Sequence, residues 1–522
     1  MAEKQDGRLR KCCAAALGAG MYALFAAFGW QIESRGTCDV PRALGVAALL
    51  AIPLYTLLSV LLARGERGCV SGQEKPFDAR RAFFVILLCY MPMFITAYPG
   101  SFAYDVPFQL RQVFTGAYST HHPLLHTLFM GGCVKLGRAL GQINLGAALY
   151  TLLQMTMLAG CFAASCASIA RSCSARAARR STLFFALYPL HMCFAVNATK
   201  DVLFSGLFVL TLSFSFEMIR EGQAGRGKTA ALALCGAGMM LLRNNALYAV
   251  AVWLPALLIF LRRRGVRLYA ALLAAVVLFT GSHGAMKAIT GAQEGNMSEM
   301  LSAPIQQLAR VRNLASKRLT EGEISAIDRI MPENSWQLYD PTISDPVKFR
   351  FDTEAFQRDA GEYIRVYLSA FKKCPDIYAD ALLAHTLAFW YPYSEYRVSG
   401  YYLQMGVSQE QTEQWCDFPW ISQTSPLRRV LDALSWRFGA KGAMQAPVIG
   451  YLFNMGVIVW AMLYFVLREM YAGRWARFAV CLLPVLLWGT FLLGPVMAGR
   501  YIYPFVCALP ALASRPRDEG GK

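Results

Sequence analysis

The sequence predicts an all-α fold: a polytopic bundle of about twelve transmembrane helices with one mostly helical insertion exposed to water. Hydrophobic residues make up 56% of the 522 residues, well above the share in a soluble chain. They concentrate in runs close to the roughly 20 residues that span hydrocarbon. One long segment near the C-terminal third is instead rich in charged residues, proline and tryptophan, which is typical of a domain in water.

Twelve apolar runs are the expected spans, and several of the later ones are short, so their exact number stays open. They cover residues 12–30, 43–63, 82–98, 145–170, 182–197, 202–216, 229–242, 246–261, 268–281, 448–467, 478–493 and 501–513. Residues 124–140 are apolar on one side but contain Lys135 and Arg138. We expect this segment to lie in the membrane interface as an amphipathic helix.

These runs divide the chain into four parts. Residues 1–81 hold two transmembrane helices and a loop. Residues 82–284 form the main transmembrane module, with an outer loop at 99–144. Residues 285–445 are the insertion, in which helices are expected at 303–318, 352–373 and 375–389. Residues 446–522 hold the last transmembrane helices and a tail.

The basic residues predict the orientation, because Lys and Arg in short loops stay on the cytoplasmic side. Arg64 and Arg67 follow the second run, and Arg171 and Arg176 follow the fourth. The expected location is therefore the plasma membrane, with both termini cytoplasmic and the 99–144 loop and the insertion outside. The net charge of +18 is dispersed among short loops, which argues against a nucleic acid partner.

Cysteine usage predicts no disulfide framework. Most of the fifteen cysteines lie in apolar runs, where a thiol behaves as a small hydrophobe. Cys374 and Cys416 both fall in the insertion, and whether they pair stays open.

Four segments on the outer face carry chemically useful side chains. An ionisable residue held close to hydrocarbon is costly and points to function. The residues are Tyr104, Asp105 and Arg111 with His121, His122 and His126 in the first outer loop and the helix after it; Lys200 and Asp201 in a turn; Arg243 between two runs; and Arg500 with Tyr501 before the last run.

Cations and a carboxylate together at this face suit transfer of a sugar from a lipid phosphate. Preorganised Lys and Arg stabilise the charge that develops on a leaving phosphate. A carboxylate near the acceptor hydroxyl or amine can act as the base. The residues therefore predict glycosyl transfer from a polyprenyl-phosphate-linked sugar donor.

The chain resembles the GT-C superfamily of membrane glycosyltransferases, to which protein O-mannosyltransferases and lipid A aminoarabinose transferases belong. The likeness covers residues 82–284 and 447–513. It rests on the Tyr104-Asp105 loop, the His-Pro-Leu-Leu segment at 122–125, the Thr-Lys-Asp turn at 199–201 and the Gly-Pro…Arg-Tyr…Pro element at 494–504.

The resemblance implies an inverting transfer in which Asp105 is the catalytic base. Lys200 and Asp201 match the second outer-loop element of the family, and Asp201 would orient Lys200 or a metal ion. Lys200, Arg243, Arg500 and Tyr501 would hold the donor phosphate. The acceptor side would comprise Tyr104, Arg111, His121, His122 and His126.

The sequence also departs from the better-known members, because Asp105 is followed by Val106 and Pro107 where the O-mannosyltransferases have an Asp-Glu pair. The acceptor is therefore expected only as a class: a cell-envelope glycan, lipid or protein.

Simpler roles remain open for the same residues. Asp105 could cap a helix that begins at Val106 or Pro107, and Lys200 with Asp201 could be a structural charge pair. Arg243 and Arg500 could reach only toward lipid headgroups. The insertion could bind the acceptor, close over the site as a lid or serve as a structural cap.

Two further alternatives concern a metal and a different activity. His122 and His126 are four residues apart and could share a divalent metal, although two ligands are too few by themselves. A transporter or flippase for a lipid-linked or anionic substrate is the rival function, because the Arg243-Asn-Asn segment could interrupt a membrane helix.

Overall fold

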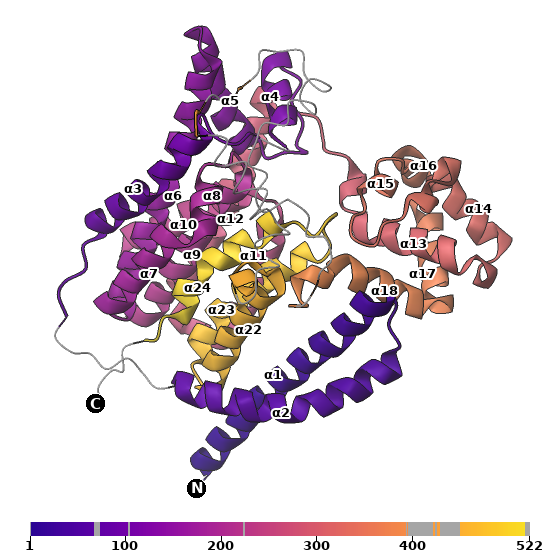
Figure 1. Cartoon of the computed structure of the whole chain (residues 1–522), viewed down its shortest axis with the longest axis horizontal. Helices are drawn as coiled ribbons and strands as arrows, with labels where there is room; N and C mark the ends of the chain where they lie inside the picture. Colours follow the sequence, from indigo (N-terminus) through magenta and orange to yellow (C-terminus); the bar gives the residue numbers. More distant parts are fainter. Residues whose placement is uncertain are drawn as a thin grey trace.

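The structure is a computed structural model that describes residues 2–66, 74–102, 105–222, 225–392, 394, 421–422, 425–427 and 449–516. Within these residues the regular elements are all helices, and strand-like contacts are limited to isolated bridges (Figure 1). The all-α class is therefore confirmed.

Most residues of the predicted apolar runs lie in helices where the structure describes them. The N-terminal and central ones are α1 (Ala2–Arg35), α2 (Val40–Glu66), α3 (Ala79–Ala97), α6 (Ile143–Ser172), α9 (Lys200–Glu221), α10 (Arg226–Leu242), α11 (Asn245–Leu261) and α12 (Val266–Thr290). The C-terminal ones are α22 (Met455–Tyr471), α23 (Trp475–Phe491) and α24 (Tyr503–Ala513). Short 3-10 turns join several of them: η1 (Arg262–Gly265), η6 (Ile449–Phe453) and η7 (Gly499–Tyr501).

Six helical segments in the described residues are long and apolar enough to cross a membrane. They are Gln5–Arg35, Val40–Glu66, Ala79–Ala97, Ile143–Ser172, Lys200–Glu221 and Asn245–Thr290, the last of which contains α11 and α12. The structure thus supports a membrane protein with several spans. The number twelve stays a prediction, because α10, α22 and α23 have 17 residues each and α24 has 11.

The surface of α2 shows why this bundle needs an apolar surrounding. Leu49 and Ile52 are 72% and 70% exposed, and Leu57 and Val60 follow on the same helix. A soluble protein rarely presents such a continuous apolar surface to water. Lipid would cover this face.

The run at 182–197 forms two helices rather than one span. It divides into α7 (Ala175–Leu187) and α8 (Pro189–Ala195), with Tyr188 between them in an extended conformation (φ −70°, ψ 121°). Pro189 explains the break, because proline disfavours a helical conformation in the residue before it and has no N–H to continue the helix.

The two helices of the loop at 99–144, which is predicted to lie outside, are α4 (Val106–Thr115) and α5 (Leu124–Ala139). The helix expected at 124–140 is therefore present. Buried residues such as Leu124 and Val134 line one side of α5, and Lys135 and Arg138 lie exposed on the other.

The insertion is helical in its described part and has a core of its own. Its elements are η2 (Met297–Glu299), α13 (Ser302–Leu314), η3 (Ser316–Arg318), α14 (Glu321–Ile330), η4 (Pro332–Leu338), α15 (Asp345–Lys348), α16 (Thr353–Arg358), α17 (Ala360–Lys373), α18 (Pro375–Thr386) and η5 (Leu387–Phe389). The three helices expected there are confirmed. The first two are each divided by a one-residue break, and the third continues from α18 directly into η5. Figure 1 shows α13 to α17 as a separate lobe beside the bundle.

Residues 387–390 of the insertion return to the main bundle. Leu387, Phe389 and Trp390 are buried in the same core as the membrane helices. Trp460 on α22 donates from its indole N–H to the Trp390 carbonyl at 2.8 Å. The aromatic end of this segment is therefore packed inside the protein, which ties the lobe to α22.

Buried glutamates anchor the basic ends of the spans. Glu217, near the end of α9, accepts from Arg171 and Lys228, both at 2.6 Å. Glu469, near the end of α22, is also fully buried and pairs with Arg468 at 2.5 Å and Arg477 at 3.2 Å. Glu217 and its cationic partners lie at the opposite end of α9 from Lys200. Each end of this helix therefore carries its own group of ion pairs.

Candidate functional site

Five charged side chains from distant parts of the chain meet at one place, which we call the charged cluster: Asp105, Lys200, Asp201, Arg243 and Arg500. The Lys200 Nζ lies 3.1 Å from Asp105 Oδ2, and Arg500 Nη1 lies 3.2 Å from the same oxygen. The structure therefore brings together the carboxylate and the cations that the predicted topology places on one face.

The loop after α3 positions Asp105 by pairing with the turn before α9. The Ser101 N–H donates to the Val196 carbonyl at 2.8 Å, and the Ala198 N–H donates to the Ser101 carbonyl at 2.8 Å. The Thr151 hydroxyl on α6 donates to the Pro99 carbonyl at 2.8 Å. These bonds hold the loop against the start of α9, so Asp105 faces Lys200.

Asp105 occupies the N-cap position of α4 but does not act as a cap. Its side chain accepts no capping hydrogen bond, and its own backbone is in the right-handed helical region (φ −76°, ψ −19°). The carboxylate is directed instead at the two cations. Capping alone therefore does not explain the residue.

A buried layer lies beneath these three groups. Asp201 is fully buried, and its Oδ1 lies 2.7 Å from Arg243 Nη1. Its Oδ2 lies 3.7 Å from Arg500 Nε and accepts from the Thr199 hydroxyl at 3.2 Å. Asp201 is predicted to orient Lys200 or a metal ion. Its cationic partners in the structure are the two arginines, whereas Lys200 contacts Asp105.

Arg243 ends α10 in an extended conformation and is held by aromatic rings. Its guanidinium lies 4.5 Å from the ring centre of Tyr501 and 4.6 Å from that of Phe491. Such cation–π contacts stabilise a desolvated guanidinium. Since Arg243 is only 8% exposed, it supports the cluster from below.

The upper layer is accessible and positively charged. The side chains of Asp105, Lys200 and Arg500 are 20%, 14% and 16% exposed. The whole cluster joins three cations to two carboxylates, which leaves one net positive charge. An anion such as a phosphate is the ligand that this balance favours.

The cations determine the protonation state of Asp105. Burial raises the pKa of this carboxyl, but the attraction of Arg500 and Lys200 outweighs burial and holds the pKa well below its ordinary value. The same attraction raises the pKa of Arg500, against the effect of burial. Asp105 is thus a carboxylate at neutral pH in this arrangement.

His122 is the histidine that borders the cluster. Its Nδ1 lies 4.0 Å from Asp105 Oδ2, and burial lowers the pKa of the imidazole to about 3, so the ring is neutral at physiological pH. The His121 ring lies 4.5 Å from the His122 ring and is exposed. These two residues form one border of the accessible layer.

His126 has a supporting role in the structure. Its Nδ1 lies 2.7 Å from Gln109 Oε1, and its Nε2 lies 2.7 Å from the Tyr150 hydroxyl. Tyr150 donates to Gln154 Oε1 at 2.7 Å, and Gln154 Nε2 donates to the carbonyls of Ala195 and Asn197. This buried chain of hydrogen bonds connects α4, α5 and α6 to the turn before Lys200.

Sequence reasoning missed Gln109, Tyr150 and Gln154. One signal was available, since Gln154 is a large polar side chain inside the apolar run 145–170. A polar group at such a position must find hydrogen-bond partners inside the protein.

The remaining predictions concern Arg111, the residues Tyr104 and Cys416, and a metal ion. Arg111 is exposed on α4, and no contact joins it to the cluster in the part of the chain that the structure describes. Tyr104 and Cys416 lie outside the described residues. Among the described residues, no group of three or more His, Cys, Asp or Glu side chains could hold a metal ion.

One family model matches the chain over residues 114–514, and its description is "Family of unknown function (DUF6020)". The matched range contains every residue of the charged cluster except Asp105. No curated protein and no solved structure matches the chain.

Proposed function

For this chain, which belongs to the family of unknown function DUF6020, we propose the activity of a membrane glycosyltransferase that uses a polyprenyl-phosphate-linked sugar. One observation carries the proposal: a single carboxylate oxygen of Asp105 is held between Lys200 and Arg500, in an accessible layer with a net positive charge. The layer lies at the ends of α3 and α9, two of the apolar helices suited to a membrane, where a lipid-linked substrate would present its phosphate.

The proposed step transfers the sugar in one displacement. The acceptor hydroxyl or amine gives its proton to Asp105, and its oxygen or nitrogen forms a bond to the anomeric carbon. The bond from that carbon to the phosphate oxygen breaks, and its electron pair leaves with the lipid phosphate. Lys200 and Arg500 stabilise the charge on the departing phosphate, and the anomeric centre is inverted.

The resting cluster suggests how donor binding would activate the base. A carboxylate with a lowered pKa is a weak base while both cations contact it. A donor phosphate competes for Lys200 and Arg500, so their attraction for Asp105 weakens and the pKa of Asp105 rises. The base then becomes effective only when the donor is present.

Asp201 and Arg243 have a positioning role in this scheme. Asp201 holds Arg500 from below while Arg243 neutralises Asp201. The guanidinium of Arg500 therefore stays near the surface layer when its contact with Asp105 is exchanged for phosphate. Tyr501, whose ring lies 5.4 Å from the Arg500 guanidinium, supports the same side chain.

The acceptor is a cell-envelope glycan, lipid or protein in this proposal, and membrane lipids surround the bundle. The charged cluster and the insertion would lie outside the plasma membrane, with both termini in the cytoplasm. The loop of residues 118–120 supports an acceptor side there, because Thr120 and Tyr118 bond through their backbones to Gln293, just before the insertion's first helical turn.

The test uses the full chain in proteoliposomes with a panel of undecaprenyl-phosphate sugars and envelope acceptors. Wild type is expected to transfer one sugar, and Asp105→Asn to lose about 100-fold or more of the rate, in line with loss of a general base. Asp78→Asn is the matched control, because Asp78 caps the other end of α3 and asparagine also caps. Transfer that survives in Asp105→Asn would remove Asp105 as the base.

A transporter or flippase is the second candidate, favoured by the gap between α10 and α11. Arg243 occupies this gap and forms a buried ion pair with Asp201, as in transporters whose broken helices bind ions. The same proteoliposomes distinguish the two activities. Movement of a labelled lipid-linked donor across the bilayer without sugar transfer would favour the transporter.

A further inference from the structure

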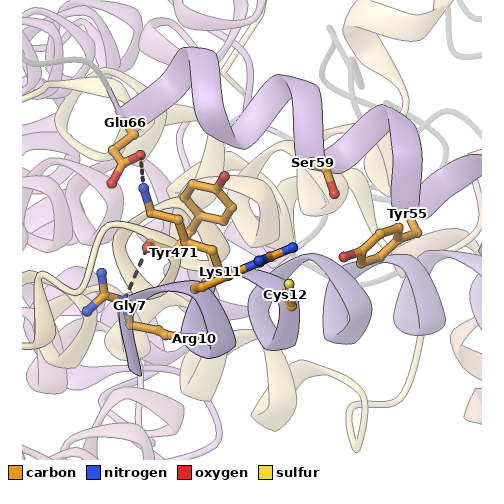
Figure 2. Close-up of a pocket in the computed structure, with 9 residues that line it drawn as sticks. Gly7, Arg10, Lys11, Cys12, Tyr55, Ser59, Glu66 and Tyr471 are labelled. Atoms are coloured by element: carbon orange, nitrogen blue, oxygen red, sulfur yellow. Dashed lines mark hydrogen bonds and ion pairs between the residues drawn. The ribbon is translucent and has the colours of Figure 1, made fainter. Parts of the chain in front are cut away.

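An open cavity of about 540 Å³ is lined by the beginning of α1, which Figure 1 shows at the opposite end of the molecule from α4, the helix that follows Asp105. It is formed by the beginning of α1, the last turns of α2 and the end of α22 (Figure 2). Its lining consists of Gly7, Arg8, Arg10, Lys11, Cys12, Tyr55, Ser59, Glu66 and Tyr471. It shares no residue with the charged cluster.

The cavity carries a surplus of positive charge. Lys11 Nζ lies 2.6 Å from Glu66 Oε2 and 5.2 Å from the ring centre of Tyr471. Arg10 donates to the Tyr471 carbonyl at 3.3 Å. No described residue forms an ion pair with Arg8. Three cations thus face one carboxylate.

The polar groups of the cavity lie at different depths along the expected membrane normal. Arg8, Arg10 and Lys11 directly precede the apolar run that begins at Cys12, so they lie at the boundary between water and hydrocarbon. Ser59 lies about 10 Å before Glu66 along α2, at 1.5 Å per residue. Figure 2 shows Ser59 and Tyr55 on α2 above Cys12 on α1.

The surfaces beside the cavity are apolar. Leu9 on α1 is 63% exposed, and Val60 and Leu61 on α2 are 45% and 37% exposed. If the charged group of a ligand entered the cavity, the rest of the ligand would contact these leucine and valine side chains. Acyl chains would bury apolar surface there, whereas a soluble anion has no apolar part to place against them.

We propose that this cavity binds the headgroup of an anionic phospholipid. The phosphate would contact Arg8 and Arg10, with Lys11 beside it, while the Ser59 hydroxyl reaches the glycerol ester region. The acyl chains would follow the exposed side of α2. Basic pockets between membrane helices bind anionic headgroups by the same electrostatics, and the site lies on the side where the basic loops gather.

The test measures lipid binding to the full chain in detergent by native mass spectrometry, with phosphatidylglycerol and phosphatidylcholine as the probes. Wild type is expected to retain phosphatidylglycerol in preference to phosphatidylcholine. Arg8→Gln should weaken this retention about fivefold, the value of one Lys or Arg contact near a membrane surface. Arg64→Gln is the matched control, because Arg64 is exposed at the same end of α2 but does not line the cavity.

A second variant and a soluble probe exclude a general charge effect. Ser59→Phe fills the cavity without changing its charge and should also lower retention of phosphatidylglycerol. Inorganic phosphate at equal concentration should displace little of the bound lipid. Equal retention by Arg8→Gln and Arg64→Gln, no effect of Ser59→Phe, equal binding of both lipids, or displacement by phosphate alone would each overturn the proposal.

Discussion

Asp201 is the residue on which the charged cluster depends most, because it is fully buried and has two arginine partners. Removing one partner of a buried pair leaves an uncompensated charge in a low-dielectric region. The accessible side chains of Asp105 and Lys200 are solvated in part, so their substitution should affect stability less than activity.

Asp201→Asn should therefore lower the free energy of unfolding by about 3–5 kcal/mol, the usual effect of breaking a buried ion pair. Adding Arg243→Met should restore part of the loss, since the unpaired cation is then gone. Chemical denaturation of the purified protein in detergent measures both changes. Asp328→Asn, which breaks a partly exposed pair with Arg312, is the control and should change little.

Two of the buried histidines, His122 and His126, should make the protein less stable in mild acid. The pKa of His122 and that of His126 are both lowered to about 3, mainly by burial, from an ordinary value of 6.5. The unfolded chain then binds protons that the folded chain does not, so the free energy of unfolding decreases as pH falls below about 6.5. The slope reaches about 1.4 kcal/mol per pH unit for each histidine.

Unfolding measured between pH 5 and pH 7 tests this dependence. Asp105 adds little there, because a lowered carboxyl pKa costs stability only at more acidic pH. His126→Gln should lower the slope by up to about 1.4 kcal/mol per pH unit, whereas the exposed His121→Gln should leave it unchanged. An unaltered slope in His126→Gln would show that its ring is protonated in the folded protein.

At the level of elements, the short loop between α3 and α4 determines where Asp105 lies. Gly100 has a φ of +136°, and a Cβ there would lie 2.3 Å from the Thr151 hydroxyl oxygen. The loop passes so close to α6 that only glycine fits at position 100. The next residue, Ser101, forms backbone hydrogen bonds with Val196 and Ala198, which hold the loop in this position.

Gly100→Ala should destabilise the protein by about 1–3 kcal/mol and also lower the transfer rate, because the loop must move away from α6. Gly116→Ala is the matched control: its φ is +74°, but open space surrounds the added Cβ. Unfolding and transfer measured on both variants separate backbone strain from packing. Equal effects in the two would mean that contact with Thr151 does not position the loop.

At the level of the whole molecule, the basic loops predict which side of the membrane each end faces. Arg226 is exposed at the start of α10, in the basic loop after α9, and this loop is predicted to lie on the inner side. Glu321, exposed at the start of α14, belongs to the insertion on the predicted outer side.

Labelling with a membrane-impermeant maleimide in intact cells tests this orientation. Glu321→Cys should react above the wild-type background, while Arg226→Cys should react only after the cells are permeabilised, because cationic loops remain in the cytoplasm. The reverse pattern would place the charged cluster inside and would rule out an outer-surface transferase.

The sequence by itself determined the helical class, the positions of most apolar helices, the three insertion helices and the set of candidate charged residues. These features depend on local composition: a run of apolar residues can satisfy its backbone only as a helix in lipid, and basic residues collect at particular ends. The division at Tyr188 was not predicted, although Pro189, the residue that explains it, is present in the sequence.

Only the tertiary structure decided which charges pair. Asp105 contacts Lys200 and Arg500, while the adjacent Asp201 contacts Arg243 and Arg500, and chain order does not reveal this exchange. Ion-pair partners depend on how the ends of α3, α9 and α10 pack and on which side chains become buried. The depth of each carboxylate depends on the same packing: Asp201 is fully buried beside two arginines, whereas the side chain of Asp105 stays 20% exposed.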